Sequence, residues 1–324
     1  MIKFKRISQE GVVFLLAVIL FTVFAVSLEQ FLAPANLISL VRSVSILGIL
    51  SLGMAVVVIG RGIDLAIVAT FVTAMSAALQ LASSGMNVEL ALVIGLVFVV
   101  AVGLVIGSIV AFAEIPAVFT TLAMGSVVFG VGRTFFFSTD AQNTPPDVPW
   151  LNSLGFGTVL GVPAIIIAFG LMAGTVHLLL RWTIFGRYIY SIGDNPEAAR
   201  LTGLPVRPVI VAQYVISGVI AFAAALVMAA SYSGINARIY NSTLVYDVLL
   251  VVVLGGIGLS GGRGGVRNVL VGTLLVGVLL NGMTIMDVSF SVQNLIKSVM
   301  LLSALVADTI INPRDEQTSQ QGDI

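Results

Sequence analysis

The chain has no cysteine, a single histidine and few charged residues, and each scarcity excludes a class of function. Without cysteine there are no disulfides or thiolate ligands, and His177 alone cannot build a multi-histidine metal site. Only 9% of the 324 residues are charged, whereas a soluble domain has about 25%. Because the net charge is also zero, there is no basic face for nucleic acid, and an ordinary solvated surface cannot form.

Hydrophobic residues are abundant instead, at 58% of the chain, and they recur along its whole length. A helix that crosses the hydrocarbon core needs about 20 mostly apolar residues, since each residue rises about 1.5 Å. We therefore expect an all-α integral membrane protein with a single transmembrane domain and about ten helices. The domain covers residues 1–324, and the expected spans are 11–32, 37–59, 63–82, 88–112, 116–137, 161–181, 208–232, 245–261, 266–286 and 291–311.

The distribution of basic residues predicts the orientation of these spans. Lys and Arg in short loops are retained on the cytoplasmic side of a membrane. With the N terminus inside, eleven of the 15 basic residues fall on the inner side, and only Arg238 falls in an outer loop. Both termini are therefore predicted to be cytoplasmic, the long loop 182–207 is predicted to lie inside, and the loop 138–160 is predicted to lie outside.

No charge is expected at the middle of the bilayer, where it would cost about 2.5 to 3.5 kcal/mol. Three bases fall within spans near their outer ends, where they can extend to the interface or line a polar outer vestibule: Arg42, Arg133 and Lys297. The acidic residues considered fall at or near span ends: Glu29, Asp64, Glu89, Asp247, Asp287 and Asp308. An ion-coupled carrier generally needs charged or broken-helix sites near the midplane, so we expect the energy to come from another protein.

A neutral interior suits an uncharged solute that is bound by hydroxyl and amide hydrogen bonds. Four polar residues within the expected spans are candidates for this solute path: Thr70, Thr73, Asn281 and Asn294. The alternative is that these side chains hydrogen-bond a neighbouring helix, as Ser, Thr and Asn often do in membranes.

The inner loop contains the signals of a short surface helix. Asp194 or Asn195 can cap it, and Pro196 suits the first turn. Glu197 lies at the positive end of the helix dipole, and Gly203 can end the helix. A short helix beneath the membrane is a plausible docking element for a partner protein.

This loop resembles the coupling loop of ABC importer permeases, whose signature is EAAxxxG. Glu197, Ala198, Ala199 and Gly203 match that signature in register, and Arg200 lies within it. The chain as a whole resembles the permeases of ribose- and xylose-type sugar importers, which are close to the branched-chain amino acid permeases. The other matching motifs lie at inner turns and include Gly62, Asp64, Gly255, Gly256, Gly261 and Gly262.

The resemblance implies a multi-pass permease of the bacterial inner membrane that transports a small neutral sugar and has no enzymatic activity of its own. It implies that residues 197–203 contact separate ABC ATPase subunits, that a second permease copy or a paralogue completes the path, and that an extracytoplasmic solute-binding protein delivers the solute. No cofactor is expected on this chain, because it has no GxxxxGK[ST] loop for ATP. ATP and Mg²⁺ would be bound by the ATPase.

Two other functions are weighed against this one. The first is a self-sufficient secondary carrier or channel for a small polar solute. The second is a rhomboid-like intramembrane protease, because Gly258, Leu259, Ser260 and Gly261 spell its GxSG motif. A nucleophilic serine needs a base within reach, and the only histidine precedes Ser260 in the chain, which is opposite to that family's order. The sequence does not distinguish among sugars, polyols and nucleosides.

Overall fold

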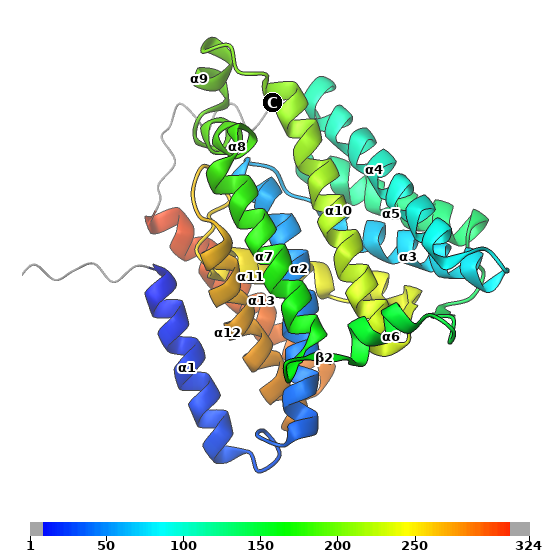
Figure 1. The fold of residues 1–324 in the computed structure, drawn as a ribbon. Helices are drawn as coiled ribbons and strands as arrows, with labels where there is room; N and C mark the ends of the chain where they lie inside the picture. Colours follow the sequence, from blue (N-terminus) through cyan, green and yellow to red (C-terminus); the bar gives the residue numbers. More distant parts are fainter. Residues whose placement is uncertain (1–8, 312–324) are drawn as a thin grey trace, which may run out of the picture.

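A computed structural model describes residues 9–311 as a bundle of helices (Figure 1). The basic residues Lys3, Lys5, Arg6 and Arg314, on which part of the predicted orientation rests, lie outside the described residues. The α-helices are α1 (Gln9–Ser27), α2 (Pro34–Ile59), α3 (Ile67–Ser83), α4 (Val88–Phe112), α5 (Ala117–Phe135), α6 (Pro149–Phe156), α7 (Ala164–Trp182), α8 (Ile184–Asp194), α9 (Pro196–Leu201), α10 (Val206–Tyr232), α11 (Leu244–Leu254), α12 (Val266–Ile285) and α13 (Phe290–Ile311). The other elements are a 3-10 helix, η1 (Ala237–Asn241), and four strands, β1 (Ala141–Asn143), β2 (Thr158–Val159), β3 (Val162–Pro163) and β4 (Gly234–Asn236).

Within residues 9–311, eight helices are long and apolar enough to cross a membrane. They correspond to eight of the ten expected spans. The third and eighth expected spans correspond to the shorter apolar helices α3 and α11. The prediction of a helix over 245–261 is wrong at its end, because α11 stops at Leu254 and the chain is non-helical from there to Gly265. Gly256 has a φ of 96°, which an L side chain rarely adopts and which ends the helix.

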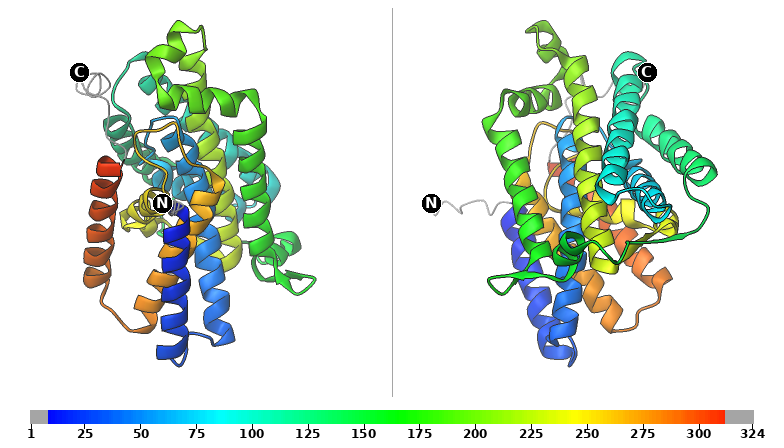
Figure 2. Two further views of the ribbon diagram at one scale, coloured as in Figure 1. Left: turned by 90° about the vertical axis from the view of Figure 1, so that its left-hand side faces the viewer. Right: turned by 45° about the vertical axis from the view of Figure 1, so that its right-hand side comes forward.

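Helix α10 occupies the centre of the bundle, where it packs against α2, α3 and α4. The side chains of α2 and α3 are mostly buried, whereas those of α1 and α13 are mostly exposed, and Figure 2 shows these two helices at the periphery. The short helices α3 and α11 are therefore enclosed by other helices and do not need the length required of a helix that faces lipid.

The two ends of the bundle differ. Helices α8 and α9 lie at one end, called here the α9 end (Figure 1). At the opposite end, called the far end, β1 pairs with β4 and β2 pairs with β3, both antiparallel. These two small sheets depart from a purely helical expectation, and β1 and β4 join the segment after α5 to the segment after α10.

Two non-helical segments, 60–66 and 255–265, connect α2 to α3 and α11 to α12. Several of their backbone groups form hydrogen bonds inside the protein, which suits the interior of a membrane bundle. The amide of Gly262 donates to the carbonyl of Ile59 at 2.8 Å. The side-chain amide of Asn268, on α12, donates to the carbonyl of Gly255 at 2.7 Å and is buried. The second bond attaches the end of α11 to α12.

Candidate functional site

The short helix predicted in the loop 182–207 is present as α9, and it is capped at both ends. The Oδ1 atom of Asn195 accepts a hydrogen bond from the amide of Ala198 at 3.0 Å, which confirms Asn195 as the N-cap. At the other end Gly203 has a φ of 79°, and its amide donates to the carbonyl of Arg200 at 3.0 Å. The left-handed glycine ends the helix as expected.

Helix α9 is held by one side chain and exposes the others. Ala199 is buried, whereas Glu197, Ala198 and Arg200 are exposed, and the side chain of Leu201 is 88% exposed. A leucine so fully exposed at the tip of a projecting helix suits contact with another protein. Four of the five residues proposed for ATPase contact are thus accessible, and Ala199 anchors the helix.

Ion pairs connect α9 to the turn between α4 and α5. The carboxylate of Glu114 lies 3.2 Å from Arg207 and 3.7 Å from Arg200. Arg200 also lies 3.5 Å from Glu197, one turn earlier in α9. All these side chains are substantially exposed, so each pair contributes at most about 1 kcal/mol. Together they link α9 to the turn between α4 and α5 and to the start of α10.

Three backbone segments meet just below α9 at a junction that only glycine can form. A Cβ atom on Gly193, at the end of α8, would lie 2.5 Å from the amide nitrogen of Gly262 and would also overlap the carbonyl of Ile59. Gly261 and Gly262 have φ values of 78° and 71°. The segment that leads into α9 therefore contacts the end of α2 and the 255–265 segment directly, with no side chain between them.

Asp64 lies much deeper than its predicted position near a span end suggests. Its side chain is buried, and the hydroxyl of Ser217 donates to its Oδ2 atom at 2.8 Å. Ser217 lies eleven residues after Val206, the first residue of α10, or about 16 Å along the helix axis. Asp64 lies in the non-helical segment 60–66, near a span end as expected, but its side chain is enclosed by the bundle. Gly62, two residues earlier, packs closely against Tyr214 and Val57.

A cavity of about 270 Å³ opens between α2, α10, α11 and α12 in the half of the bundle toward the far end. Its polar lining consists mainly of hydroxyl and amide groups, from Ser39, Ser43, Tyr232, Asn281 and Thr284, together with Asp247. This composition suits a small solute with several hydroxyl groups. Of the four candidate path residues, Asn281 lines this cavity.

The other three candidates lie elsewhere. Thr70 and Thr73 are buried in α3, and the Oγ1 atom of Thr73 has no hydrogen-bond partner. Asn294 accepts a hydrogen bond from Thr243 at 3.2 Å. Asn281 itself exchanges two hydrogen bonds with Asn36, at 3.0 and 2.9 Å, so it both joins two helices and lines the cavity.

One lining residue of this cavity, Asp247, belongs to a buried ion pair. The Nζ atom of Lys297 lies 2.8 Å from the carboxylate of Asp247 and donates to the hydroxyl of Thr243 at 2.8 Å. Lys297 is only 7% exposed, so the expectation that it extends to the membrane surface is wrong. The pair joins α11 to α13, and the only signal for it in the sequence is the presence of two opposite charges in expected spans.

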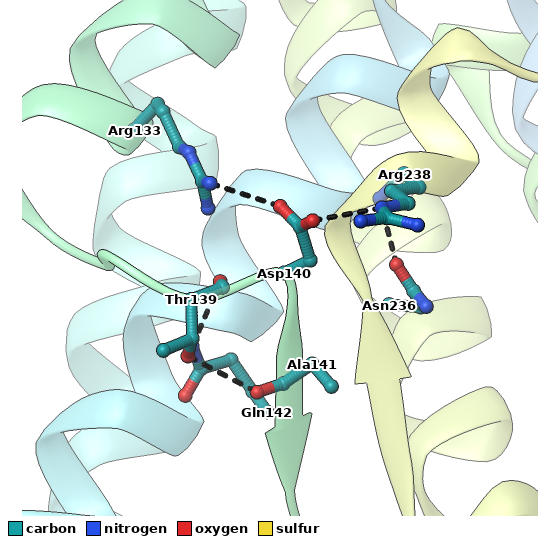
Figure 3. A network of polar contacts seen from close by, with 7 residues as sticks. All are labelled: Arg133, Thr139, Asp140, Ala141, Gln142, Asn236 and Arg238. Carbon is teal, nitrogen blue, oxygen red and sulfur yellow. Dashed lines mark hydrogen bonds and ion pairs between the residues drawn. The ribbon is translucent and has the colours of Figure 1, made fainter.

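At the far end, Asp140 joins α5 to η1 (Figure 3). Its carboxylate lies 2.9 Å from Arg133 and 2.7 Å from Arg238, and the two bases approach from opposite sides. The hydrogen bond from Arg238 is the main reason that the pKa of Asp140 is lowered, and the charge of Arg133 adds to it. Arg133, one of the three bases within expected spans, is therefore paired at the surface. The third, Arg42, lies over the ring of Phe156 at 5.0 Å.

Comparison with known proteins gives a consistent picture. The family described as "Branched-chain amino acid transport system / permease component" matches residues 36–305. The chain is 29% identical to the ribose import permease protein RbsC of Escherichia coli, over 86% of this chain and 87% of that one. It is 30% identical to the L-arabinose ABC transporter permease protein AraH of Azospirillum brasilense, over 94% and 88%, and 30% identical to the fructose import permease protein FruF of Bifidobacterium longum, over 85% and 80%. No solved structure matches significantly.

Proposed function

Because the chain belongs to the family of branched-chain amino acid transport system permease components, we propose that it is the membrane subunit of an ATP-driven importer for a small neutral sugar or sugar-like solute. It is a multi-pass protein of the inner (plasma) membrane, and eight of its described helices are long enough to span. The α9 end faces the cytoplasm in this proposal, as the distribution of basic residues indicates, and the far end faces outward.

The observation that carries the proposal is the position of α9. This helix is capped, projects from the bundle and follows Gly193, which packs directly on the ends of α2 and the 255–265 segment. A protein that binds Glu197, Ala198, Arg200 and Leu201 would therefore move the backbone of two core segments when it moves α9. The partner is an ABC ATPase, which binds ATP and Mg²⁺, so this chain needs no nucleotide site.

The outer cavity supports the choice of solute. Its lining of Ser39, Ser43, Tyr232, Asn281 and Thr284 offers hydrogen-bond donors and acceptors without net charge, since Lys297 neutralises Asp247. The relatives named for ribose, L-arabinose and fructose point to the same class of solute. An extracytoplasmic binding protein would deliver the sugar, and a second copy or a paralogue would complete the path.

Ionisable side chains inside the bundle keep one alternative open. The sequence predicted no charge at the middle of the bilayer, and that expected absence counted against an ion-coupled carrier. Asp64 and the Asp247–Lys297 pair are buried ionisable groups, so the charge pattern alone does not exclude such a carrier. The proposal therefore rests on α9 and on family membership, and an ion-coupled carrier is the alternative that the test has to exclude.

Replacing Ala198 with Arg tests the proposal. The N-cap bond uses the backbone amide of Ala198, and its side chain is exposed, so the variant keeps the helix while adding bulk and charge where the ATPase would bind. We expect Ala198→Arg to abolish ATP-stimulated sugar uptake by the complex isolated from native membranes and reconstituted in liposomes. Ala198→Ser, which adds only a hydroxyl at the same place, is the control and should retain uptake.

Two results would overturn the proposal. The first is sugar uptake by liposomes that contain this chain and no ATPase. The second is undiminished ATP-stimulated uptake by Ala198→Arg in a complex of unchanged composition, which would show that α9 does not couple ATP hydrolysis to transport.

A further inference from the structure

A basic cavity of about 740 Å³ lies at the α9 end, outside the proposed coupling and solute sites. It lies between α1, α7, α8 and α12, and its charged lining consists of Arg181, Arg187, Arg267 and Glu10. Three guanidinium groups and one carboxylate give the cavity lining a net positive charge. None of its lining residues belongs to α9 or to the solute cavity.

The arginines have no counter-ion among residues 9–311. Arg181, Arg187 and Arg267 are exposed, and none of them forms an ion pair with a described carboxylate, Glu10 included. Three like charges around one cavity repel one another unless an anion lies between them. The cavity is therefore electrostatically suited to an anion.

The backbone favours an anion at the same place. Helix α12 begins in the cavity with Val266, and its N-cap, Gly265, has no side chain to accept from the first amides. The hydroxyl of Tyr190 donates to the carbonyl of Gly264 at 2.8 Å, which holds this N terminus against α8. The unsatisfied amides and the positive end of the helix dipole add to the field of the guanidinium groups.

Exposed apolar side chains lie one helical turn from two of these arginines, on the bilayer side. Leu178 precedes Arg181 by one turn of α7 and is 57% exposed, and Leu270 follows Arg267 by one turn of α12 and is 39% exposed. Helices α1 and α7 lie on either side of α12 (Figure 1), and both are peripheral. The basic side chains of the cavity are therefore followed, nearer the middle of the membrane, by exposed apolar side chains.

We propose that this cavity binds the headgroup of an anionic phospholipid from the cytoplasmic leaflet, with the phosphate among Arg181, Arg187 and Arg267 and the acyl chains along Leu178 and Leu270. A free phosphate would use the guanidinium groups but would gain nothing from the leucines. Basic cavities between helices at the cytoplasmic side are suited to anionic headgroups. The lipid binds beside α1 and α7, away from the exposed face of α9.

The test measures retained lipid by native mass spectrometry of the full chain, purified from nanodiscs with equal amounts of phosphatidylglycerol and phosphatidylethanolamine. The wild-type protein should retain phosphatidylglycerol preferentially, and the double variant Arg187→Gln/Arg267→Gln should lose about tenfold of that preference. The control Arg207→Gln/Arg263→Gln removes the same charge from the same side but no residue that lines this cavity, and its lipid preference should match that of the wild-type protein.

A second measurement leaves the cavity intact. The chain has only two tryptophans, Trp150 and Trp182, and Trp182 follows Arg181 and is 76% exposed. In a Trp150→Phe background, brominated phosphatidylglycerol should quench Trp182 several-fold more than brominated phosphatidylethanolamine at the same mole fraction.

Equal retention of the two lipids by the wild-type protein, or equal quenching by them, would overturn the proposal. So would an unchanged preference in the Arg187→Gln/Arg267→Gln variant. Displacement of the retained lipid by excess inorganic phosphate would identify a soluble anion as the natural occupant, and preferential binding of an acidic peptide would identify a protein partner. Either result excludes the lipid. Neither measurement depends on transport, so the proposed function can fail without affecting this result.

Discussion

Gly193 and Gly262 lie so close together that a Cβ atom on Gly193 would come within 2.5 Å of the amide nitrogen of Gly262. Gly193 lies in the last turn of α8, three residues before α9 begins, and Gly262 belongs to the segment between α11 and α12. The backbone that leads into the exposed helix α9 therefore contacts the backbone of the core directly. No flexible side chain lies between them that could absorb a movement.

We predict that Gly193→Ala impairs the protein even though it adds a single methyl group. The methyl group would meet the backbone of Ile59 and Gly262, which cannot move aside like a flexible side chain, so overpacking should cost about 1 to 3 kcal/mol. Thermal unfolding in detergent and ATP-stimulated uptake should both decline. Gly174→Ala, in α7, is the control because a Cβ atom there meets nothing within 4 Å. If both variants behave alike, the junction has no special role.

The reciprocal amide pair of Asn281 and Asn36 allows a test of the outer cavity. Asn281→Ala and Asn36→Ala both break these two hydrogen bonds, but only Asn281 lines the cavity. Asn36→Ala also breaks the bond that the Asn36 amide donates to the carbonyl of Phe31 at 2.8 Å. We expect Asn281→Ala to raise the sugar concentration for half-maximal uptake about tenfold, which corresponds to about 1.4 kcal/mol. Asn36→Ala should leave that concentration unchanged while reducing thermal stability at least as much. Equal transport defects in the two variants would mean that the pair is only structural.

Replacing one member of the buried Asp247–Lys297 pair should reduce the stability of the protein more than replacing both. Lys297→Met leaves the Asp247 carboxylate in the bundle without its cation, and such a loss destabilises by about 3 to 5 kcal/mol. The double variant Asp247→Asn/Lys297→Met removes both charges and should regain most of this stability. Unfolding midpoints of the single and double variants in detergent measure the effect. Additive losses would show that the two side chains are not energetically coupled.

The stabilising effect of the ion pairs between Asp140 and its two arginines should be lost at acidic pH. Because the pKa of Asp140 is lowered in the folded protein, its stabilising contribution is present above the ordinary Asp pKa of about 3.9 and is lost as the pH falls through the folded value. The protection of residues 138–143 against hydrogen exchange, relative to an unfolded peptide at the same pH, should therefore be unchanged from pH 7 to about pH 5 and should fall at more acidic pH. Asp140→Asn should show the reduced protection already at pH 7. A loss of protection in the unmodified protein at pH 6 would contradict the assignment.

Much of the fold follows from hydropathy and from local capping rules. Eight of the long helices and the short helix α9 correspond to predictions, because the length of an apolar run and the sequence Asn195-Pro196 at a helix start are local signals. The end of α11 was not predicted. A length rule derived from helices that face lipid does not apply to a helix enclosed by its neighbours.

The deeper features of the site depend on contacts between distant parts of the chain. Lys297 pairs with Asp247, which is fifty residues away in the sequence. Ser217 donates a hydrogen bond to Asp64, which is more than one hundred and fifty residues away. A single sequence shows that these residues are polar but not which partner each has. The glycine motif at 261–262 was recognised from a resemblance, and its physical role became clear only when Gly193 was found against it.

The hydrogen bond from Asn268 to the carbonyl of Gly255 restricts how the bundle can rearrange. The carbonyl of Gly255 has no partner within α11, because that helix has already ended. If α11 separated from α12, this carbonyl would lose its hydrogen bond in a region without water, at a cost of several kcal/mol. The two helices should therefore travel as one rigid body whenever the protein alternates between conformations, with the hinge placed outside them.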